Sequence, residues 1–241
     1  MGLNKAKGRM FKSVGWTWNP IAGGTHDCAY CWAKALRARW GKGFEPEIRR
    51  KYWNDKMPGD GSWVFVGSMG DVFCDGIPKE WILELLDYIK NCEADNKFLL
   101  QTKNPPRFHE RDIYASLKEV QNKVIVGTTI ETTDETRTWS KAPPTYLRFY
   151  DLHTMKLAGF KTFLSLEPLA DFRITTMKEW IMRIQPEAVE LGLENYSHHL
   201  PRPSNEKIIK LVKWLNKKGI TYVLKENLDW VNHEINGGVK S

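Results

Sequence analysis

The amino-acid sequence predicts an α/β fold, a partial (open) TIM-type barrel of about six to seven strand–helix units. One observation is the steady alternation of short apolar runs with segments whose apolar residues recur at helical spacing. Parallel strands joined by helical crossovers produce this order. A second observation is that polar or small residues recur just after the strands. A barrel gathers such residues on one rim, whereas a doubly wound open sheet spreads them along an edge. We therefore expect residues 1–241 to form a single partial-barrel domain.

The predicted strands are short runs rich in apolar and β-branched residues. They cover residues 16–20, 63–67, 97–103, 123–131, 161–168, 187–192 and 220–225. The first strand leads directly into the loop that contains two of the four cysteines. The strand over 161–168 must stop at Pro168, because proline has no backbone N–H to donate to a neighbouring strand.

The predicted helices alternate with these strands and carry start and stop signals. They cover residues 33–40, a segment from Pro78 through Ile89, a turn or helix from 104 to about 117, residues 151–158 and 175–184, and a segment after Ser204. Pro78 and Ser204 are residues that favour helix starts. Gly41, Gly159 and Gly219 are typical of helix ends. Residues 132–144 are interpreted as a polar crossover.

Composition limits the class of protein. With 41% hydrophobic residues, a chain of 241 residues can bury a sizeable core. No apolar run is long enough to span a bilayer, and the N-terminus lacks the apolar core of a signal peptide. We therefore expect a cytoplasmic protein without a membrane partner. The net charge of +7 makes an anionic partner plausible, although a solvated basic surface explains the charge equally well.

The loop between the first strand and the first helix contains Cys28 and Cys31 in C-x-x-C spacing. Four cysteines in a chain of this size do not indicate a disulfide scaffold. The N-terminus of a helix favours anionic thiolates, and two thiolates at this spacing can bind one soft metal centre from one side. Two other interpretations remain open: a thiol–disulfide oxidoreductase, and a structural zinc site completed by Cys74 and His26.

Polar or charged side chains are expected on the rim where the strands end. They are Cys28, Ser68, Asp71, Lys103, Glu131, Glu167, Glu194 and Lys225. In a barrel this rim carries the active site, because the loops after all the strands meet there. Each residue also has a structural alternative. Lys103 and Glu167 can form an ion pair with each other, Glu131 can cap a helix, and Asp71 can cap the turn before Pro78.

Residues 24–31, Gly-Thr-His-Asp-Cys-Ala-Tyr-Cys, resemble the C-x-x-x-C-x-aromatic-C loop of radical S-adenosylmethionine (SAM) enzymes. The whole chain looks more closely like phage and bacterial proteins related to the radical-SAM spore photoproduct lyase. The motifs that carry this resemblance lie in order at residues 17–20, 65–73, 99–105, 126–127 with Glu131, and 164–169. Their order over nearly the whole chain, rather than any one motif, carries the resemblance.

The sequence departs from that pattern at Gly24, where the family has the first of three cluster cysteines. The third ligand is predicted to be Cys74, from the loop after the second strand. His26 is an alternative ligand, since imidazole binds some iron–sulfur clusters. The cluster can also be labile or take an outside ligand, or the scaffold can have lost the chemistry and kept nucleic-acid binding. Cys92 is interpreted as a core thiol.

The resemblance implies a 4Fe–4S cluster bound by Cys28, Cys31 and Cys74, and an enzyme that reductively cleaves SAM. The implied product is a 5′-deoxyadenosyl radical that abstracts hydrogen from a substrate. The residues it assigns to SAM are Tyr30 near the adenine, Ser68, Met69 and Gly70 near the amino group, and Glu131 near the ribose. Lys103 and Glu167 are assigned to the SAM carboxylate or to the substrate, as the catalytic pair.

The resemblance and the positive charge point to a nucleic acid or nucleotide as substrate, with an electron donor such as flavodoxin or ferredoxin. A run of cations interleaved with aromatic rings suits phosphates and stacked bases. It consists of Arg37, Arg39, Lys42, Arg49, Arg50 and Lys51 with Trp40, Tyr52 and Trp53. A solvated amphipathic segment is the alternative. Residues 195–199, Asn-Tyr-Ser-His-His, form a polar loop whose histidines can protonate a substrate.

Overall fold

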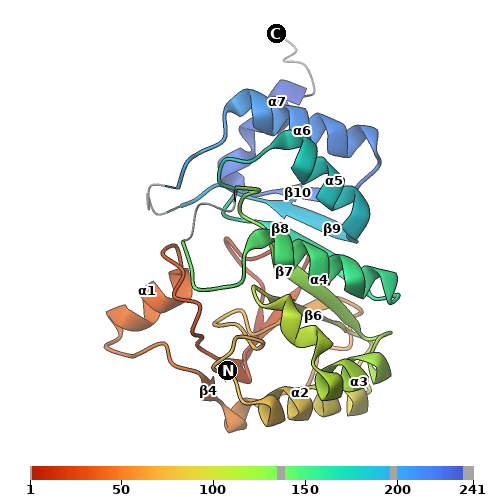
Figure 1. The fold of residues 1–241 in the computed structure, drawn as a ribbon. Coiled ribbons are helices and arrows are strands. Elements are labelled where there is room, and N and C mark those ends of the chain that lie inside the picture. Colours follow the sequence, from red (N-terminus) through yellow and green to blue (C-terminus); the bar gives the residue numbers. More distant parts are fainter. Residues whose placement is uncertain (1, 135–138, 196–199, 236–241) are drawn as a thin grey trace.

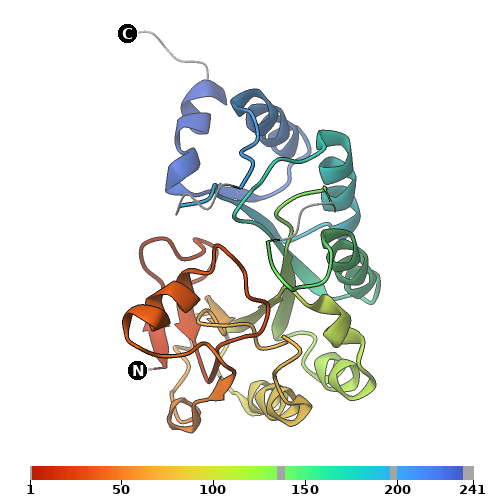
Figure 2. The same cartoon turned by 60° about the vertical axis from the view of Figure 1, so that its left-hand side comes forward.

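The computed structural model describes residues 2–134, 139–195 and 200–235. Among these residues one sheet contains eight strands, in the spatial order β1 (Leu3–Lys5), β2 (Trp16–Trp18), β5 (Trp63–Val66), β6 (Lys97–Thr102), β7 (Val124–Thr129), β8 (Lys161–Leu166), β9 (Ala188–Leu191) and β10 (Tyr222–Leu224) (Figure 1). β1 is antiparallel to β2, and every later pair is parallel. The sheet curls into a half-barrel (Figure 2), which confirms the predicted partial TIM-type barrel.

Most of the helices connect successive strands, as the alternating pattern predicts, and the last helix follows the last strand. The helices are α1 (Trp32–Arg39), α2 (Lys79–Asn91), α3 (Arg111–Glu119), α4 (Thr145–Leu157), α5 (Ile174–Ile184), α6 (Asn205–Lys217) and α7 (Trp230–Ile235), with the short 3-10 helices η1 (Arg50–Tyr52), η2 (Pro105–His109) and η3 (Glu226–Leu228). Figure 2 shows α2 to α6 along the outer side of the curled sheet. Ser204 caps α6 as predicted, since its side chain accepts a hydrogen bond from the backbone N–H of Lys207.

Three features differ from the sequence prediction. α4 begins at Thr145 and not at residue 151, because its buried face includes Arg148 together with Leu152 and Met155. A charged residue at a core position hides the apolar period of a helix. β1 and α7 were not predicted. The small antiparallel pair of β3 (Ile21–Ala22) and β4 (Glu47–Ile48) was not predicted either.

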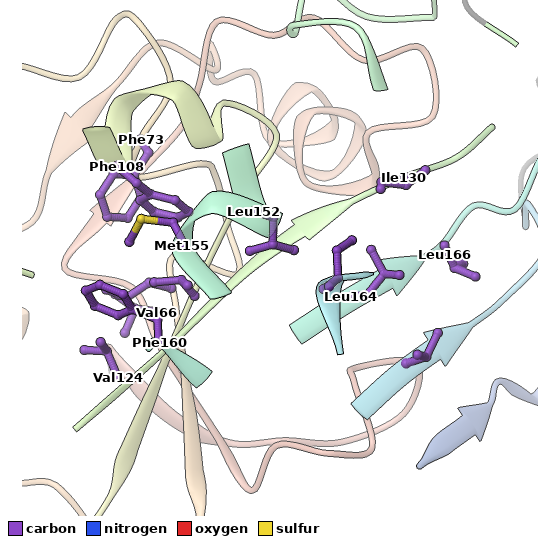
Figure 3. Close-up of a cluster of buried hydrophobic side chains, with 14 of the residues drawn as sticks. Val66, Phe73, Phe108, Val124, Ile130, Leu152, Met155, Phe160, Leu164 and Leu166 are labelled. Atoms are coloured by element: carbon purple, nitrogen blue, oxygen red, sulfur yellow. The ribbon is translucent and has the colours of Figure 1, made fainter. Parts of the chain in front are cut away.

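The sheet buries apolar side chains on both of its faces, because successive residues of a strand point to opposite sides. Phe98, Leu100 and Leu164 point outward into the large core between sheet and helices. Figure 3 shows part of this core, where Phe73 from the loop after β5 and Phe108 of η2 pack near Met155 of α4. The alternate residues Leu99 and Phe163 point inward and belong to a separate inner cluster.

The inner cluster is completed by the segment between β1 and β2, which we call the N-terminal strap (residues 6–14). Phe11 and Val14 of the strap pack against Leu99, Ile125 and Phe163 on the concave face. The Phe11 ring lies 5.1 Å from the Phe163 ring between centroids. A half-barrel leaves its interior open on one side, and here the strap fills part of that interior.

None of the helices in the described part of the chain has the length and apolar character needed to cross a lipid bilayer.

Candidate functional site

A cavity of about 790 Å³ lies at the carboxyl ends of the parallel strands. Six of the eight rim residues predicted from the sequence line it: Cys28, Ser68, Asp71, Lys103, Glu167 and Glu194. Gly24, His26 and Tyr30 line the same cavity. The predicted convergence of strand-end residues is therefore present. Glu131 and Lys225 contact lining residues from behind, as described below.

The two cysteines occupy the wall of the cavity formed by the loop before α1. Both are partly buried free thiols, and the Cys31 sulfur accepts a hydrogen bond from the backbone N–H of Lys34 at 3.4 Å. Burial raises the pKa of the Cys28 thiol, although the nearby Lys103 charge opposes this effect. Cys31 occupies the N-cap position of α1, and Cys28 lies three residues before it.

The cysteine loop is fixed from outside by the segment around Trp139. The backbone N–H of Ala29 donates to the Trp139 carbonyl at 2.9 Å, and Lys141 N–H donates to the His26 carbonyl at 2.6 Å. Asp27 forms ion pairs with Lys34 and Lys141, which lower the pKa of its carboxyl group. The loop therefore has a defined position relative to the strand ends.

An iron–sulfur cluster fits these residues only in part. Two thiols line the cavity, but the described residues contain no group of three or more His, Cys, Asp or Glu side chains arranged to hold one metal ion. The predicted third ligand, Cys74, is fully buried and is absent from the cavity lining. For the same reason, the described residues do not assemble the zinc site in which Cys74 and His26 would join the two cysteines.

Position 24 nevertheless has room for a side chain. A Cβ atom added to Gly24 meets no atom closer than 3.7 Å, and one of the atoms at that distance is the Cys74 sulfur. The neighbouring Gly23 and Gly70 differ, since a Cβ atom there comes within 2.1 and 2.2 Å of backbone atoms. Gly24 is therefore not required by the backbone, and the Cys74 thiol lies directly behind it.

His26 forms a buried pair with Asp71. The His26 Nε2 atom lies 2.9 Å from Asp71 Oδ2, and the same carboxylate accepts hydrogen bonds from the backbone N–H groups of Phe73 and Lys103 at 3.0 and 2.8 Å. Burial opposes ionisation of Asp71, but these hydrogen bonds outweigh it and lower the pKa of the carboxyl group. Asp71 thus organises its own turn, as the structural alternative predicts, and also positions His26.

Glu131 is the centre of a buried charge network. Its carboxylate accepts hydrogen bonds from Tyr30 Oη, from Lys103 Nζ at 2.5 Å and from Arg148 Nη1 at 2.8 Å, and the residue is 3% exposed. Burial alone would raise its pKa, but the Arg148 and Lys103 charges lower the pKa to about 2. The network joins the cysteine loop to the ends of β6 and β7. Arg148 was not predicted, because periodicity gives no signal for a charged residue on a buried helix face.

Glu167 pairs with Lys225 and not with Lys103. The Lys225 Nζ atom lies 3.4 Å from Glu167 Oε2 and 3.3 Å from Glu190 Oε2. Burial raises the pKa of the Glu167 carboxyl group, and the Lys225 charge reduces that rise. The alternative of a Lys103–Glu167 pair is therefore wrong for this structure, where each residue has a different partner.

Three of the six cations in the predicted basic patch form ion pairs within the protein. Arg37 and Arg49 both pair with Glu47, and Arg50 pairs with Glu84. These contacts reduce the free positive charge that the run of cations offers to a nucleic acid. Trp53, half-buried, packs against other rings and is not an open stacking surface. Residues 196–199 of the predicted polar loop lie outside the described residues.

The arrangement of this chain is similar to solved structures of larger proteins. A mutant of spore photoproduct lyase with bound AdoMet and dinucleoside spore photoproduct aligns with a TM-score of 0.59 and 12% identity, over 88% of this chain and 63% of that one. SuiB of Streptococcus suis bound to S-adenosylmethionine aligns with a TM-score of 0.56 and 9% identity, over 93% of this chain and 50% of that one.

Identity at this level shows a shared fold, and the chain spans 63% of the length of the spore photoproduct lyase mutant. No curated protein matches the sequence. A family sequence model described as "Protein of unknown function (DUF5131)" matches residues 12–231, which is most of the chain.

Proposed function

This chain belongs to the DUF5131 family, and on that premise we propose that it is a radical-SAM-type enzyme that acts on a nucleotide or nucleic acid. The observation that carries the proposal is that Cys28 and Cys31 line the same cavity as Ser68, Lys103 and Glu167 at the strand ends. The shared fold supports it, since two proteins of this fold are described with bound SAM. One of them also holds a dinucleoside ligand.

The loop after β5 is suited to hold the amino acid end of SAM. Asn19 Oδ1 accepts hydrogen bonds from Ser68 Oγ at 3.2 Å and from the Met69 backbone N–H at 2.8 Å. The Met69 carbonyl accepts from Gly23 N–H at 3.1 Å, so both backbone groups of Met69 are used internally. Ser68 and Gly70 line the cavity and are the residues of this loop that would contact SAM.

Lys103 and Glu167 would orient the reacting groups. Lys103 would bind the SAM carboxylate through its ammonium group, which Glu131 holds at 2.5 Å. Glu167 would accept a hydrogen bond from the substrate, with its charge balanced by Lys225. The carboxylate oxygens of Glu131 already accept hydrogen bonds from Tyr30, Lys103 and Arg148. Glu131 would therefore position Tyr30 and Lys103 toward the ribose rather than contact the ribose itself.

Cys28 and Cys31 would hold an iron–sulfur cluster, whose chemistry when bound is to supply one electron for the reductive cleavage of SAM. Cys74 would act as the third ligand if its thiol turned past Gly24 into the cavity. A substrate bound in this cavity would be partly shielded from water, which would protect a reactive substrate radical from side reactions. An electron donor such as flavodoxin or ferredoxin would be required.

The test is anaerobic reconstitution with iron and sulfide, followed by metal analysis, absorption spectroscopy and a SAM-cleavage assay. Wild type is compared with Gly24→Cys, with Cys28→Ser, and with Gly24→Cys combined with Cys74→Ser, which prevents a disulfide between positions 24 and 74. We expect Cys28→Ser to bind no cluster and Gly24→Cys to bind more iron and to retain SAM cleavage. Absence of iron, SAM binding and SAM cleavage in wild type and in both Gly24→Cys variants would overturn the proposal.

A second candidate is a non-catalytic nucleic-acid-binding scaffold. Gly24 favours it, because the described residues do not assemble a third ligand beside the two cysteines. Salt-dependent DNA binding by the reconstituted protein without any SAM cleavage would support this candidate.

A further inference from the structure

The N-terminal strap is held in place by two buried charged residues of the last strands. Glu190, 0% exposed, accepts hydrogen bonds from the backbone N–H groups of Lys12 and Ser13 at 3.1 and 2.8 Å. Lys225, 4% exposed, donates from Nζ to the Arg9 carbonyl at 2.9 Å. Buried charges are costly unless they are paired and hydrogen-bonded, so these contacts fix the backbone of the strap at Arg9.

The strap also forms one side of the cavity. Lys7, Arg9, Met10 and Phe11 line it, together with the cysteine loop. The Phe11 ring is 9% exposed and lies 5.3 Å from Phe65 between centroids, so it anchors the chain next to Arg9. The side chains of Lys7 and Arg9 are exposed at this edge.

Some of the positively charged side chains that line the cavity form ion pairs with carboxylates, and others do not. Lys34 and Lys141 pair with Asp27, and Lys103 pairs with Glu131. Within the described ranges, Lys7 and Arg9 take part in none of the ion pairs, although the Arg9 charge acts on Glu167 from a distance. Two cations that form no ion pair with a described residue, next to a backbone that is fixed at Arg9, are suited to receive an anionic group.

We propose that Lys7 and Arg9 bind the phosphate of a nucleotide substrate at the strap side of the cavity. The guanidinium group of arginine matches the geometry of a phosphate, and both contacts are charge-assisted. Trp32 lines the same cavity and is 40% exposed, which supplies a ring for base stacking. Cations together with an open ring favour a nucleotide over a simple carboxylic acid. The inference rests on the proposed function and specifies how its substrate is held.

The experiment measures binding of the dinucleotide TpT and of its neutral methylphosphonate analogue by calorimetry, with SAM binding as a separate arm. Wild type is compared with the double variant Lys7→Ala/Arg9→Ala. Lys12→Ala is the matched control, because Lys12 lies on the same strap, is exposed and does not line the cavity. Thermal unfolding checks that each variant is folded.

We expect the double variant to bind TpT more than about tenfold more weakly, because one charge-assisted contact typically accounts for about tenfold and the variant removes two. The methylphosphonate analogue should bind weakly to all variants, and Lys12→Ala should match wild type. The inference is overturned if wild type binds no TpT, if the double variant binds TpT as tightly as wild type, or if the neutral analogue binds equally well. SAM binding is measured in a separate arm. Absence of SAM binding by wild type counts against the proposed enzyme and not against the phosphate site.

Discussion

The hydroxyl group of Tyr30 donates a hydrogen bond to the carboxylate of Glu131, a residue 101 positions further along the chain. Tyr30 stands between the two cavity cysteines, and Glu131 follows β7. The ammonium group of Lys103 lies over the Tyr30 ring, 5.0 Å from its centroid. This contact therefore sets where the cysteine loop lies on the half-barrel.

Replacing Tyr30 with phenylalanine should loosen that loop. The variant loses one buried hydrogen bond to a charged group, and we expect it to lower the free energy of unfolding by about 1.5–3 kcal/mol. Cys28 should also react faster with a thiol reagent. Tyr146→Phe is the control, because Tyr146 is an exposed residue of α4. Equal stability and equal thiol reactivity of Tyr30→Phe and wild type would contradict the assigned role.

Removing the Glu131 charge should have a larger effect. In Glu131→Gln the buried Arg148 loses its carboxylate partner, and a broken buried ion pair costs about 3–5 kcal/mol. Urea unfolding at neutral pH measures this loss. Glu119→Gln breaks only the exposed pair with Lys90, so we expect a change below about 1 kcal/mol. Similar losses in the two variants would show that the network is not a buried one.

The Glu131 network also predicts a dependence on pH. The folded-state pKa is lowered from 4.5 to about 2, so the unfolded chain binds the proton more readily than the folded chain. The stabilisation is therefore complete above pH 4.5 and disappears as the pH falls toward 2. The difference in free energy of unfolding between wild type and Glu131→Gln should shrink by about 3 kcal/mol across this range. A constant difference would contradict the lowered pKa.

Two glycines that line the cavity, Gly24 and Gly70, should differ in how well they tolerate substitution by alanine. Gly24→Ala adds a methyl group where nothing lies closer than 3.7 Å, and we expect a stability within about 1 kcal/mol of wild type. Gly70→Ala places its Cβ atom 2.2 Å from the Gly23 carbonyl oxygen at a backbone bridge, and should cost about 1–3 kcal/mol. Thermal unfolding of the pair measures the contrast, and equal midpoints would refute it.

Replacing Glu190, the buried residue that accepts hydrogen bonds from the strap, should release the strap. Glu190→Gln keeps an acceptor oxygen for only one of the two backbone N–H groups of the strap, places an amide NH2 against the other, and loses the charge that balances Lys225. We expect trypsin to cleave after Lys7, Arg9 and Lys12 about tenfold faster, since a loss near 1.4 kcal/mol in local stability has that effect. Glu187→Gln serves as control, because its pair with Lys161 is largely exposed. Unchanged cleavage of Glu190→Gln would contradict the tether.

Much of the fold follows from local sequence signals. The strands are apolar and β-branched runs, and the helices between them carry caps such as Ser204, so their order and the half-barrel are predictable. The gathering of Ser68, Lys103 and Glu167 in one cavity follows from that order, because parallel strands end on the same side.

The partners of the charged residues do not follow from the sequence. Glu131 could be predicted to face the rim, but its contact with Arg148 depends on which face of α4 meets the sheet. The strap was not predicted, because its contacts with Glu190 span 177 and 178 positions and it has no periodic pattern. Free cations such as Lys7 and Arg9 can be distinguished from paired ones only once all ion pairs are known.

The strap also bears on how the molecule can be trimmed. The family model matches residues 12–231, so a chain shortened to these residues would lack Arg9, Met10 and Phe11. Phe65 and Phe163 would then face water on the concave side, and the Lys225 ammonium group would lose the carbonyl that it binds. The folding unit therefore starts upstream of the region that sequence similarity defines, and excision at that boundary should give a protein prone to aggregation.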